Sequence, residues 1–369
     1  MKNRYIFPIL VILSLLGFVP GANSQDMNYS QYFSTPMYYN PAFTGINTGV
    51  RARFLYRSQW PTLPVPYKSY FFSADLGDRN LPGSGGIGIM INQDTPDVGL
   101  INNFGAALTV GVRIPITEFM VSQIGIKAGI MQRRISWDDL VFADNLDPRY
   151  GNIYQTSFMP SDASKRVVPD FGAGGVLQFI NPNGNLSGNL GFAVDHLFQP
   201  DVSFLSTGAS VYPRKYVGQI DLIYTAGPGG SSSSSMSRSL DDPLKIMFGG
   251  IFQNQASLNS LQVGLNMLKY NIYLGAWYKT TMTGVVNTSA ALVAGYKYSF
   301  YPDMSIKFMY SYDLQISGAL QGTGGAHEIS LVLEFDKLQL FGGGGGGSGS
   351  FPGTGGRMGG GPMECPTFY

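Results

Sequence analysis

The sequence predicts an all-β fold, a transmembrane antiparallel β-barrel of about fourteen strands. Three observations support this prediction: apolar and polar residues alternate with period two along most of the chain, only 13% of residues are charged, and 13% are aromatic. A soluble domain carries about twice that share of charged residues. Aromatic side chains gather where a barrel wall meets the two membrane interfaces. The composition therefore favours a wall that faces lipid.

Residues 1–24 have the pattern of a secretory signal peptide. Lys2 and Arg4 supply positive charge at the start, residues 6–18 are mostly apolar, and small residues precede Gln25. The alternative is an uncleaved membrane anchor, but a spanning helix needs about 20 apolar residues and this run is shorter. We expect export in a Gram-negative bacterium and a mature chain that begins at Gln25.

Two segments flank the predicted barrel, which we place at residues 49–341. Residues 25–48 are rich in Tyr, Asn and Pro without periodicity, and we expect an N-terminal periplasmic or plug segment. Residues 342–369 combine a glycine-rich linker with a short C-terminal motif, and glycine at that density behaves as flexible coil. With an even number of strands, both termini are expected in the periplasm.

The alternation is clear near Val50, where Phe54 and Tyr56 share one face while Arg53 and Arg57 share the other. A soluble sandwich buries the apolar face, whereas an outer-membrane barrel turns that face to lipid and the polar face to the lumen. Alternation alone does not separate these two folds. The lengths of the strands and of their connections distinguish the sandwich from the barrel.

Fourteen candidate strands can be placed, and many are longer than the about 5–6 residues of an ordinary strand. They begin near Val50, Tyr67, Ser84, Ile101, Phe119, Asp170, Ser187, Lys215, Leu244, Leu258, Tyr270, Asn287, Met304 and His327. Their connections tend to alternate between short and long, as in barrels with short periplasmic turns and long outer loops. Residues 227–243 break this rule, being either a flexible loop or a sign of a miscounted strand.

Several blocks of the sequence resemble the PorP/SprF family. The longest runs from Gln31 to Gly45, and Arg57 to Trp60 follows it. Tyr312-Asp313 with residues 324–331 is similar to the last hairpin of that family, and Cys365 to Phe368 is similar to its Cys-Pro-x-Phe ending. The blocks occur in the family's order along nearly the whole mature chain. The long glycine linker and the additional Tyr369 depart from the family pattern, which leaves the role of the tail open.

The resemblance implies an outer-membrane protein of type IX secretion and gliding motility. Such a protein would scaffold or anchor a secreted surface adhesin or other cargo and contact periplasmic components of the secretion system. The alternative function is a passive porin with an open lumen. Candidate partner-binding residues are Trp60, Tyr38, Asn40, Pro41, Cys365 and Phe368.

Two of these candidates have a second interpretation. Trp60 begins a proline-rich stretch at a strand end, where it is either an interfacial girdle residue or part of a partner-binding edge. Cys365 is the single cysteine, so it is either an ordinary tail thiol or the site of a disulfide bond to another protein.

The charges that face the lumen also have two interpretations. Arg51, Arg53 and Arg57 share the lumenal face of the first strand, and a basic lining favours anions. They can instead pair with acidic residues of the neighbouring strands, of which Glu328 and Glu334 are the main candidates, with Asp75 and Asp336. We favour pairing, because an unpaired buried charge is costly.

No catalytic, cofactor or metal site is expected. Residues 83–88 match GxGxxG as a string but continue as an alternating strand, whereas a dinucleotide site needs a helix there. His196 and His327 are far apart in sequence, and hydrogen bonding is favoured over metal binding.

The acidic residues in the longest predicted outer loop do not have the spacing of an EF-hand. We therefore favour a solvated loop over a calcium-binding site there. These acidic residues are Asp138, Asp139, Asp144 and Asp147. A net charge of +1 does not indicate the excess of basic residues that nucleic-acid binding requires.

Overall fold

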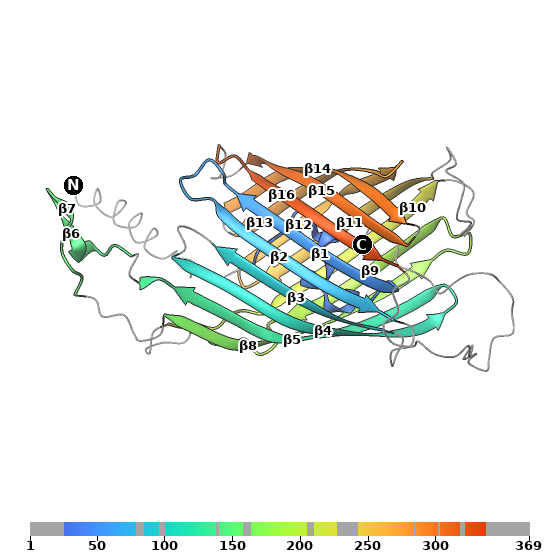
Figure 1. Ribbon diagram of the computed structural model, residues 1–369, viewed down its shortest axis with the longest axis horizontal. Helices are drawn as coiled ribbons and strands as arrows, with labels where there is room; N and C mark the ends of the chain where they lie inside the picture. Colours follow the sequence, from blue (N-terminus) through green and yellow to red (C-terminus); the bar gives the residue numbers. More distant parts are fainter. Residues whose placement is uncertain are drawn as a thin grey trace, which may run out of the picture.

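In the computed structural model the chain forms one closed barrel of fourteen antiparallel strands (Figure 1). The structure describes residues 26–78, 85–95, 100–137, 140–157, 164–204, 210–226, 243–283, 285–301, 303–317 and 322–336. Residues 1–25, the segment on which the signal peptide was predicted, lie outside this description, as does the glycine-rich tail from residue 342 onward. Among the described residues, no helix has the length and apolar character of a transmembrane helix.

The predicted fold and strand number are confirmed. The strands are β1 (Gly49–Gln59), β2 (Tyr67–Gly77), β3 (Gly86–Thr95), β4 (Ile101–Thr117), β5 (Met120–Ile135), β8 (Lys165–Ile180), β9 (Leu186–Asp195), β10 (Lys215–Ala226), β11 (Leu244–Gln255), β12 (Leu258–Lys269), β13 (Ile272–Thr283), β14 (Val285–Tyr301), β15 (Met304–Ser317) and β16 (Ala326–Phe335). Every strand pairs with its neighbours along the barrel, and β1 pairs with β16 to close it. We call this β1–β16 pairing the seam.

One strand begins earlier than its sequence pattern predicts. The alternation indicated a start for β8 near Asp170, whereas the strand begins at Lys165. The extra residues pair with the far end of β5, so that Arg134 stands opposite Lys165. Charged residues outside the lipid do not show the apolar alternation, which is why the pattern missed this end.

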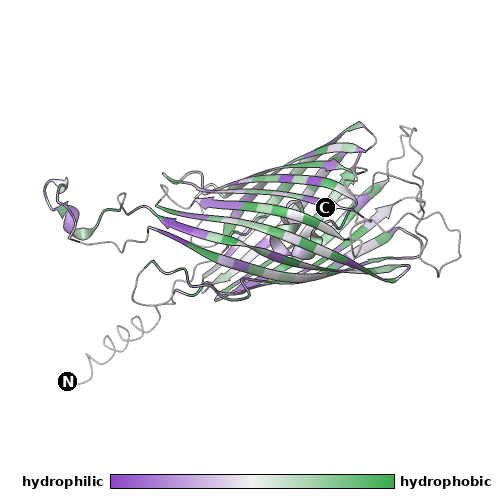
Figure 2. Ribbon diagram, turned by 60° about the horizontal axis from the view of Figure 1, so that its bottom comes forward, coloured by the Kyte–Doolittle hydropathy of each residue, from purple (hydrophilic) through white to green (hydrophobic). Residues whose placement is uncertain are grey.

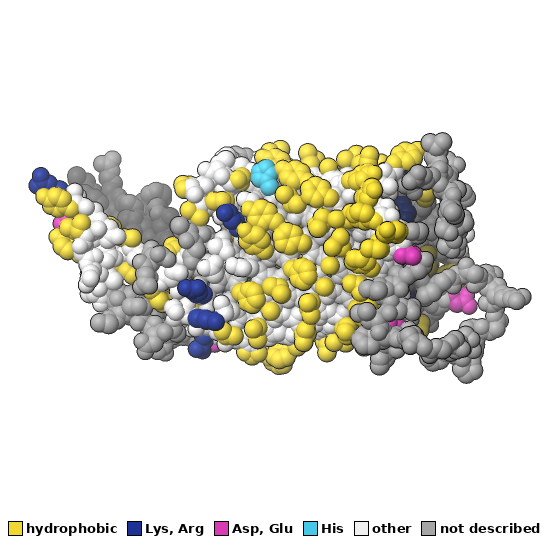
Figure 3. All heavy atoms as spheres, viewed as in Figure 1, with side chains coloured by type: hydrophobic (Ala, Val, Ile, Leu, Met, Phe, Trp, Pro, Cys, Tyr) yellow, Lys and Arg dark blue, Asp and Glu magenta, His cyan; other side chains and the backbone are white. Residues whose placement is uncertain are grey.

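The pattern of burial is the reverse of that in a soluble protein. On β1, Phe54 is 41% exposed on the outer surface, whereas Arg53 is 1% exposed inside the barrel. The same alternation holds on β5, where Ile126 is exposed and Lys127 is buried. Figure 2 shows hydrophobic and hydrophilic residues alternating along the strands, and Figure 3 shows an apolar outer wall. Such a surface is stable in lipid and not in water.

The two ends of the barrel differ in their connections. At one end, which we call the short-turn end, β4–β5, β12–β13 and β14–β15 are joined by tight turns. At the other, the long-loop end, the connections include residues 136–164 and 196–214. The first of these loops contains a small sheet of β6 (Leu146–Asp147) and β7 (Gly151–Asn152).

The connection that broke the predicted alternation is a hairpin loop at the short-turn end. Ala226 of β10 pairs with Leu244 of β11, so these strands are consecutive neighbours. A miscounted strand, one of the two explanations offered by the sequence, is therefore wrong. Residues 227–242 themselves lie outside the described part of the chain.

Residues 26–48 run through the inside of the barrel, and we call them the lumenal segment. They form three short helices, η1 (Tyr32–Ser34), α2 (Pro36–Tyr39) and η2 (Pro41–Phe43), seen inside the barrel in Figure 1. A proline occupies the first turn of both α2 and η2, where its missing N–H costs nothing. Nearly every residue of the segment is buried. The segment therefore lies where a porin has an open channel.

The described chain begins and ends at opposite ends of the barrel. The Asp26 N–H donates to Gln255 Oε1 at the long-loop end (2.8 Å), whereas the Asp336 N–H donates to the Asp303 carbonyl at the short-turn end (2.9 Å). The lumenal segment crosses the lumen once before β1, which accounts for this arrangement. The two termini themselves lie outside the described residues, so the expectation that both are periplasmic stays a prediction.

Candidate functional site: the lumenal segment and its anchors in the barrel wall

The lumenal segment is anchored at the seam by one carboxylate. Glu328 on β16 is fully buried and accepts hydrogen bonds from the backbone N–H groups of Ser30 (2.7 Å) and Gln31 (2.8 Å). It also pairs with Arg57 of β1, whose guanidinium lies 3.0 Å from Asp313 of β15. Charge-assisted hydrogen bonds of this kind are about twice as strong as neutral ones. The Glu328 carboxylate thus connects both seam strands to the segment.

The Gln31 side chain adds a second set of bonds at this point. Its Nε2 donates to Ser311 Oγ (3.0 Å) and to the Glu328 carbonyl (3.3 Å). Its Oε1 accepts from Ser330 Oγ at 2.6 Å. All of these residues are buried, so each bond is made in a low-dielectric interior. The segment is positioned in the lumen by directional bonds in addition to apolar contact.

The lumenal charges singled out in the sequence all lie in ion pairs. The pairs are Arg51 with Glu334 (3.5 Å) and Asp336 (2.9 Å), Arg53 with Asp75, Arg57 with Asp313 (3.0 Å) and Glu328, and Glu334 with Lys307 (2.8 Å) and Lys297 (3.3 Å). Asp75 also accepts from the Gly45 N–H at 2.9 Å. This geometry matches the pairing interpretation, since burial without partners would cost several kcal/mol per charge.

An aromatic cluster fills the middle of the lumen. Tyr32 and Phe33 of the segment pack against Trp277 of β13, with ring centroids 5.2 and 5.7 Å away. The Tyr32 hydroxyl donates to Asp221 on β10 at 2.6 Å. Aromatic pairs in this geometry contribute about 0.5–1.5 kcal/mol beyond area burial.

Two glycines of the wall allow the segment to approach the strands closely. A Cβ at Gly125 of β5 would lie 2.3 Å from the Pro41 backbone, and one at Gly174 of β8 would lie 2.1 Å from Asn40 Oδ1. The Asn40 amide donates to the Gly175 carbonyl at 3.1 Å, and its oxygen accepts from the Ala42 N–H at 2.9 Å. Larger side chains here would push η2 off the wall.

These contacts place three of the predicted partner-binding residues. Tyr38, Asn40 and Pro41 are buried between the lumenal segment and the wall. While the segment is seated, their contacts are with the barrel of the same chain, so an external partner does not reach them. They hold the segment in the lumen.

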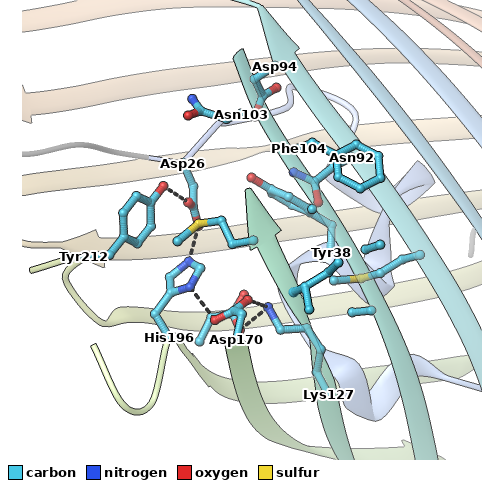
Figure 4. Close-up of a pocket in the computed structure, with 17 residues that line it drawn as sticks. Asp26, Tyr38, Asn92, Asp94, Asn103, Phe104, Lys127, Asp170, His196 and Tyr212 are labelled. Atoms are coloured by element: carbon cyan, nitrogen blue, oxygen red, sulfur yellow. Dashed lines mark hydrogen bonds and ion pairs between the residues drawn. The ribbon is translucent and has the colours of Figure 1, made fainter. Parts of the chain in front are cut away.

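A charged cluster anchors the beginning of the segment at the long-loop end (Figure 4). His196, directly after β9, lies between Asp26 (Nε2 to Oδ2, 3.0 Å) and Asp170 (Nδ1 to Oδ1, 2.7 Å). Asp26 also accepts from the Tyr212 hydroxyl at 2.7 Å and lies 3.2 Å from Lys215 Nζ.

The charges of this cluster balance within the described chain. Lys127 pairs with Asp170 (2.8 Å) and with Asp195. The cluster therefore has three carboxylates with two ammonium groups and one imidazole. Asp26, Asp195 and His196 are close enough together to hold a metal ion, but protein cations already neutralise these carboxylates.

The protonation states agree with this arrangement. Burial alone would lower the pKa of His196, but the carboxylates of Asp26, Asp195 and Asp170 outweigh it and raise that pKa to about 10. Burial opposes ionisation of Asp26 too, yet Lys215 and His196 hold its pKa well below the usual range. The imidazolium and the carboxylate are therefore both charged at neutral pH.

A small polar cavity of about 40 Å³ lies beside this cluster. Asp26, His196 and Tyr212 line one side of it, and Asp94 and Asn103 line another (Figure 4). A space of this size holds one or a few water molecules. It is much smaller than a channel for solutes or a site for a drug-sized ligand.

Trp60 lies outside the lumen, at the long-loop end of the seam. Its backbone has φ 58, a left-handed conformation, and its N–H donates to the Gly325 carbonyl at 2.7 Å. The proline-rich loop that it begins packs on residues 322–325, with Thr62 N–H donating to the Thr323 carbonyl at 3.4 Å. Trp60 thus lies where two loops meet beside the seam. Cys365 and Phe368, the other predicted contact residues, lie outside the described residues.

The remaining singled-out residues have local structural roles. Gly86 begins β3, so the GxGxxG string leads into a strand. His327 Nδ1 lies 2.7 Å from the Tyr310 hydroxyl on the outer wall.

The aspartates of the longest loop form local hydrogen bonds. Asp144 accepts from Thr156 and Ser157, and Asp147 accepts from the N–H groups of Arg149 and Tyr150. These bonds order residues 140–157. These hydrogen bonds lower the pKa of both aspartates. Asp138 and Asp139 lie outside the described residues.

Several anchoring residues were missed by sequence reasoning. Asp26, Ser30 and Lys215 have no local pattern that marks them, because each acts through a contact with a distant part of the chain. Lys127 was not missed in this way, because the alternation of β5 places it on the lumenal face, together with Arg133. A search for single charges on that face would also have found Asp170 and Asp221.

The fold and the site define a class of protein: an outer-membrane β-barrel whose lumen is occupied by its own N-terminal segment. The sequence profile of the family described as "Type IX secretion system membrane protein PorP/SprF" matches residues 21–333. The chain belongs to this PorP/SprF family, which is a family of membrane proteins and not of enzymes. No curated protein matches the chain.

Solved structures with a similar fold are barrels of distant sequence. Omp33 of Acinetobacter baumannii is 6% identical with a TM-score of 0.38, over 79% of this chain and 99% of that one. A FadL homologue of Pseudomonas aeruginosa is 12% identical with a TM-score of 0.42, over 80% and 92%. The NanC porin is 12% identical with a TM-score of 0.35, over 78% and 99%. Values this low establish no shared function.

Removal of the seam carboxylate should loosen the barrel. In Glu328→Ala, Arg57 loses one of its two carboxylate partners and the Ser30 and Gln31 N–H groups lose their acceptor. Breaking a buried pair costs about 3–5 kcal/mol. We expect a lower temperature for the gel-mobility shift of the folded barrel. Ser330→Ala, which removes only the neutral hydrogen bonds of the Ser330 hydroxyl to Gln31 and Ser34, should cost about 1 kcal/mol. Equal losses in the two variants would contradict the assigned role of Glu328.

The anchor at His196 should weaken at alkaline pH. Its pKa is raised from about 6.5 when unfolded to about 10 in the folded barrel. The stabilisation is therefore complete below about pH 6.5 and is lost as the pH rises through about 10. The groups facing His196 are Asp26, Asp170, Asp195 and Tyr212, with Lys127 and Lys215 beside these carboxylates.

Hydrogen exchange tests this pH dependence. Protection factors of residues 26–33 should fall between pH 7 and pH 10.5 in the wild type. In His196→Asn, which has no titratable imidazole, they should start lower and change less over that range. If both proteins lose protection in parallel, the titration belongs to another group and the assignment to His196 fails.

Proposed function

We propose that this PorP/SprF protein is a plugged barrel that serves type IX secretion as a scaffold or anchor for a secreted surface protein. The observation that carries the proposal is the occupied lumen. Residues 26–48 fill it and are tied to the wall at Glu328, Asp75 and the His196 cluster. A passive porin requires an open lumen, whereas a scaffold requires only a stable wall and exposed ends.

The proposal includes an orientation in the membrane. Outer-membrane barrels have short periplasmic turns and longer loops outside. On this rule the short-turn end faces the periplasm, and β16 delivers the C-terminal tail there. The tail, with Cys365 and Phe368, is then the segment that contacts periplasmic components of the secretion system. The lumenal segment begins at the outer end, which leaves the tail as the main periplasmic contact.

The outer end offers a surface for cargo. Residues 140–157 extend from the barrel beyond β5 and are ordered by their own hydrogen bonds around Asp144, Asn145 and Asp147 (Figure 1). Tyr150 and Tyr154 are 67% and 53% exposed. Exposed aromatic residues on an ordered loop are typical of protein contacts. Trp60, beside the seam at the same end, is the second candidate for such a contact.

Conductance separates the scaffold from the porin. In planar bilayers the wild-type barrel should show no steady open channel. Gly125→Leu places a side chain where a Cβ already lies 2.3 Å from Pro41, so the segment must shift and conductance should rise. Gly218→Leu is the matched control, because a Cβ at Gly218 meets nothing within 4 Å. A large steady conductance of the wild type would favour the porin instead.

Affinity purification tests the partners. The tagged full chain, extracted from native membranes in mild detergent, should bring down a secreted surface protein and periplasmic secretion components. Replacement of Tyr150 and Tyr154 by serine should reduce the surface protein about tenfold or more, as expected for two hot-spot aromatics. Truncation after residue 341 should release the periplasmic components only. A clean barrel with no partners in every preparation would refute the scaffold function.

A further inference from the structure

The outer face of the barrel carries a pair of like charges at the long-loop end. Arg134 of β5 and Lys165 of β8 are direct cross-strand partners, and both are exposed. Like charges in directly opposed positions destabilise a sheet. No ion pair among the described residues involves either of them. Within the described part of the chain, the two charges therefore face outward without a carboxylate partner, and an anion at this position would relieve their repulsion.

The depth of this pair along the barrel indicates where that anion lies. Arg134 shares the outer face of β5 with Ile130, which is 48% exposed, and lies four residues beyond it. Four residues span about 13 Å along a strand. On β8, Lys165 precedes the exposed residues Val167 and Phe171 on the same lipid-facing side, and it is therefore nearer to the long-loop end than they are. The charges therefore lie just past the apolar wall, at the depth of lipid headgroups.

Other cations increase the positive potential of this rim. Lys68 is exposed on the outer face of β2. Arg133 and Arg166 occupy the adjacent cross-strand position, whose side chains point to the lumenal side, and Arg166 interacts there with Asp201. Figure 3 shows Lys and Arg side chains gathered at this border of the apolar wall. By contrast, aromatic residues such as Tyr270, Phe300 and Tyr301 are exposed at the short-turn end. The two membrane borders of the barrel are thus chemically different.

We propose that Arg134 and Lys165, which we call the basic rim pair, bind the phosphate groups of an anionic lipid in the outer leaflet. Arg134 supplies a planar guanidinium that matches a phosphate with two hydrogen bonds, and Lys165 supplies a mobile ammonium. The acyl chains of the same lipid lie against Ile130, Val167 and Phe171. The assignment to the outer leaflet rests on the orientation in the proposed function.

Occupation of the rim pair has a structural consequence. The β5–β8 ladder leads into the connection at residues 136–164, of which residues 140–157 are described as an ordered unit. A bound phosphate removes the repulsion between the two strands at the base of that loop. The lipid therefore stabilises the strand ends from which the proposed cargo surface extends. It also fixes the height of the barrel in the membrane.

Native mass spectrometry of the full chain in a neutral detergent tests the proposal. The probes are diphosphorylated lipid A and the same lipid after removal of its phosphates. The wild type should bind the phosphorylated lipid, and Arg134→Gln with Lys165→Gln should weaken binding about 10-fold to 30-fold, since each basic residue near a lipid surface contributes about fivefold. Lys269→Gln, an exposed charge at the short-turn end, is the matched control and should bind as the wild type does.

Three results would overturn the proposal. Equal binding by the double variant and the wild type would remove the role of the rim pair. Equal binding of the dephosphorylated lipid would remove the role of phosphate. Displacement of the lipid by about 10 mM inorganic phosphate would identify free phosphate as the ligand, given the weak affinity of single surface contacts. None of these results alters conductance or partner recovery, so this inference and the proposed function fail separately.

Discussion

The structure depends on the burial of charge inside a wide barrel. An eight-stranded barrel is filled by its own side chains, whereas fourteen strands leave a lumen too wide for that. Here the lumenal face of the wall also carries Arg, Lys, Asp and Glu, which are costly to bury without partners. Pairing along the wall satisfies some of them. The carboxylates of Glu328 and Asp75 need the lumenal segment as well, because its N–H groups are their remaining donors.

The seam and the lumenal segment are coupled through the same atoms. Glu328 lies on the last strand, Arg57 on the first, and Ser30 and Gln31 on the segment that precedes the first. With β16 paired to β1, the Glu328 carboxylate lies within reach of both the guanidinium and the two N–H groups. Barrel closure and seating of the segment are therefore mutually dependent.

The sequence predicted the wall well and the interior poorly, for a physical reason. Strand alternation is a local property, so Phe54 and Tyr56 against Arg53 and Arg57 was enough to assign the faces of β1. The anchors of the lumenal segment are not local: Gln31 and Glu328 are separated by 297 residues, and His196 and Asp26 by 170. The segment itself packs as short helices around prolines, which leave no period to read. The block from Gln31 to Gly45 resembles the family signature, which indicated that the segment has a role but did not show that it lies inside the barrel lumen.

The two ends of the molecule have different chemistry, and the lumenal segment links them. At the long-loop end its first residue is held by an imidazolium and an ammonium, both electrostatic contacts that respond to pH and salt. Toward the short-turn end it is held by close backbone approach to Gly125 and Gly86, which responds to neither, and by the Gly45 N–H on the Asp75 carboxylate. The contacts that depend on protonation of an imidazole are therefore at the long-loop end, the same end as residues 140–157 and Trp60, so a change of pH acts on the segment from that end.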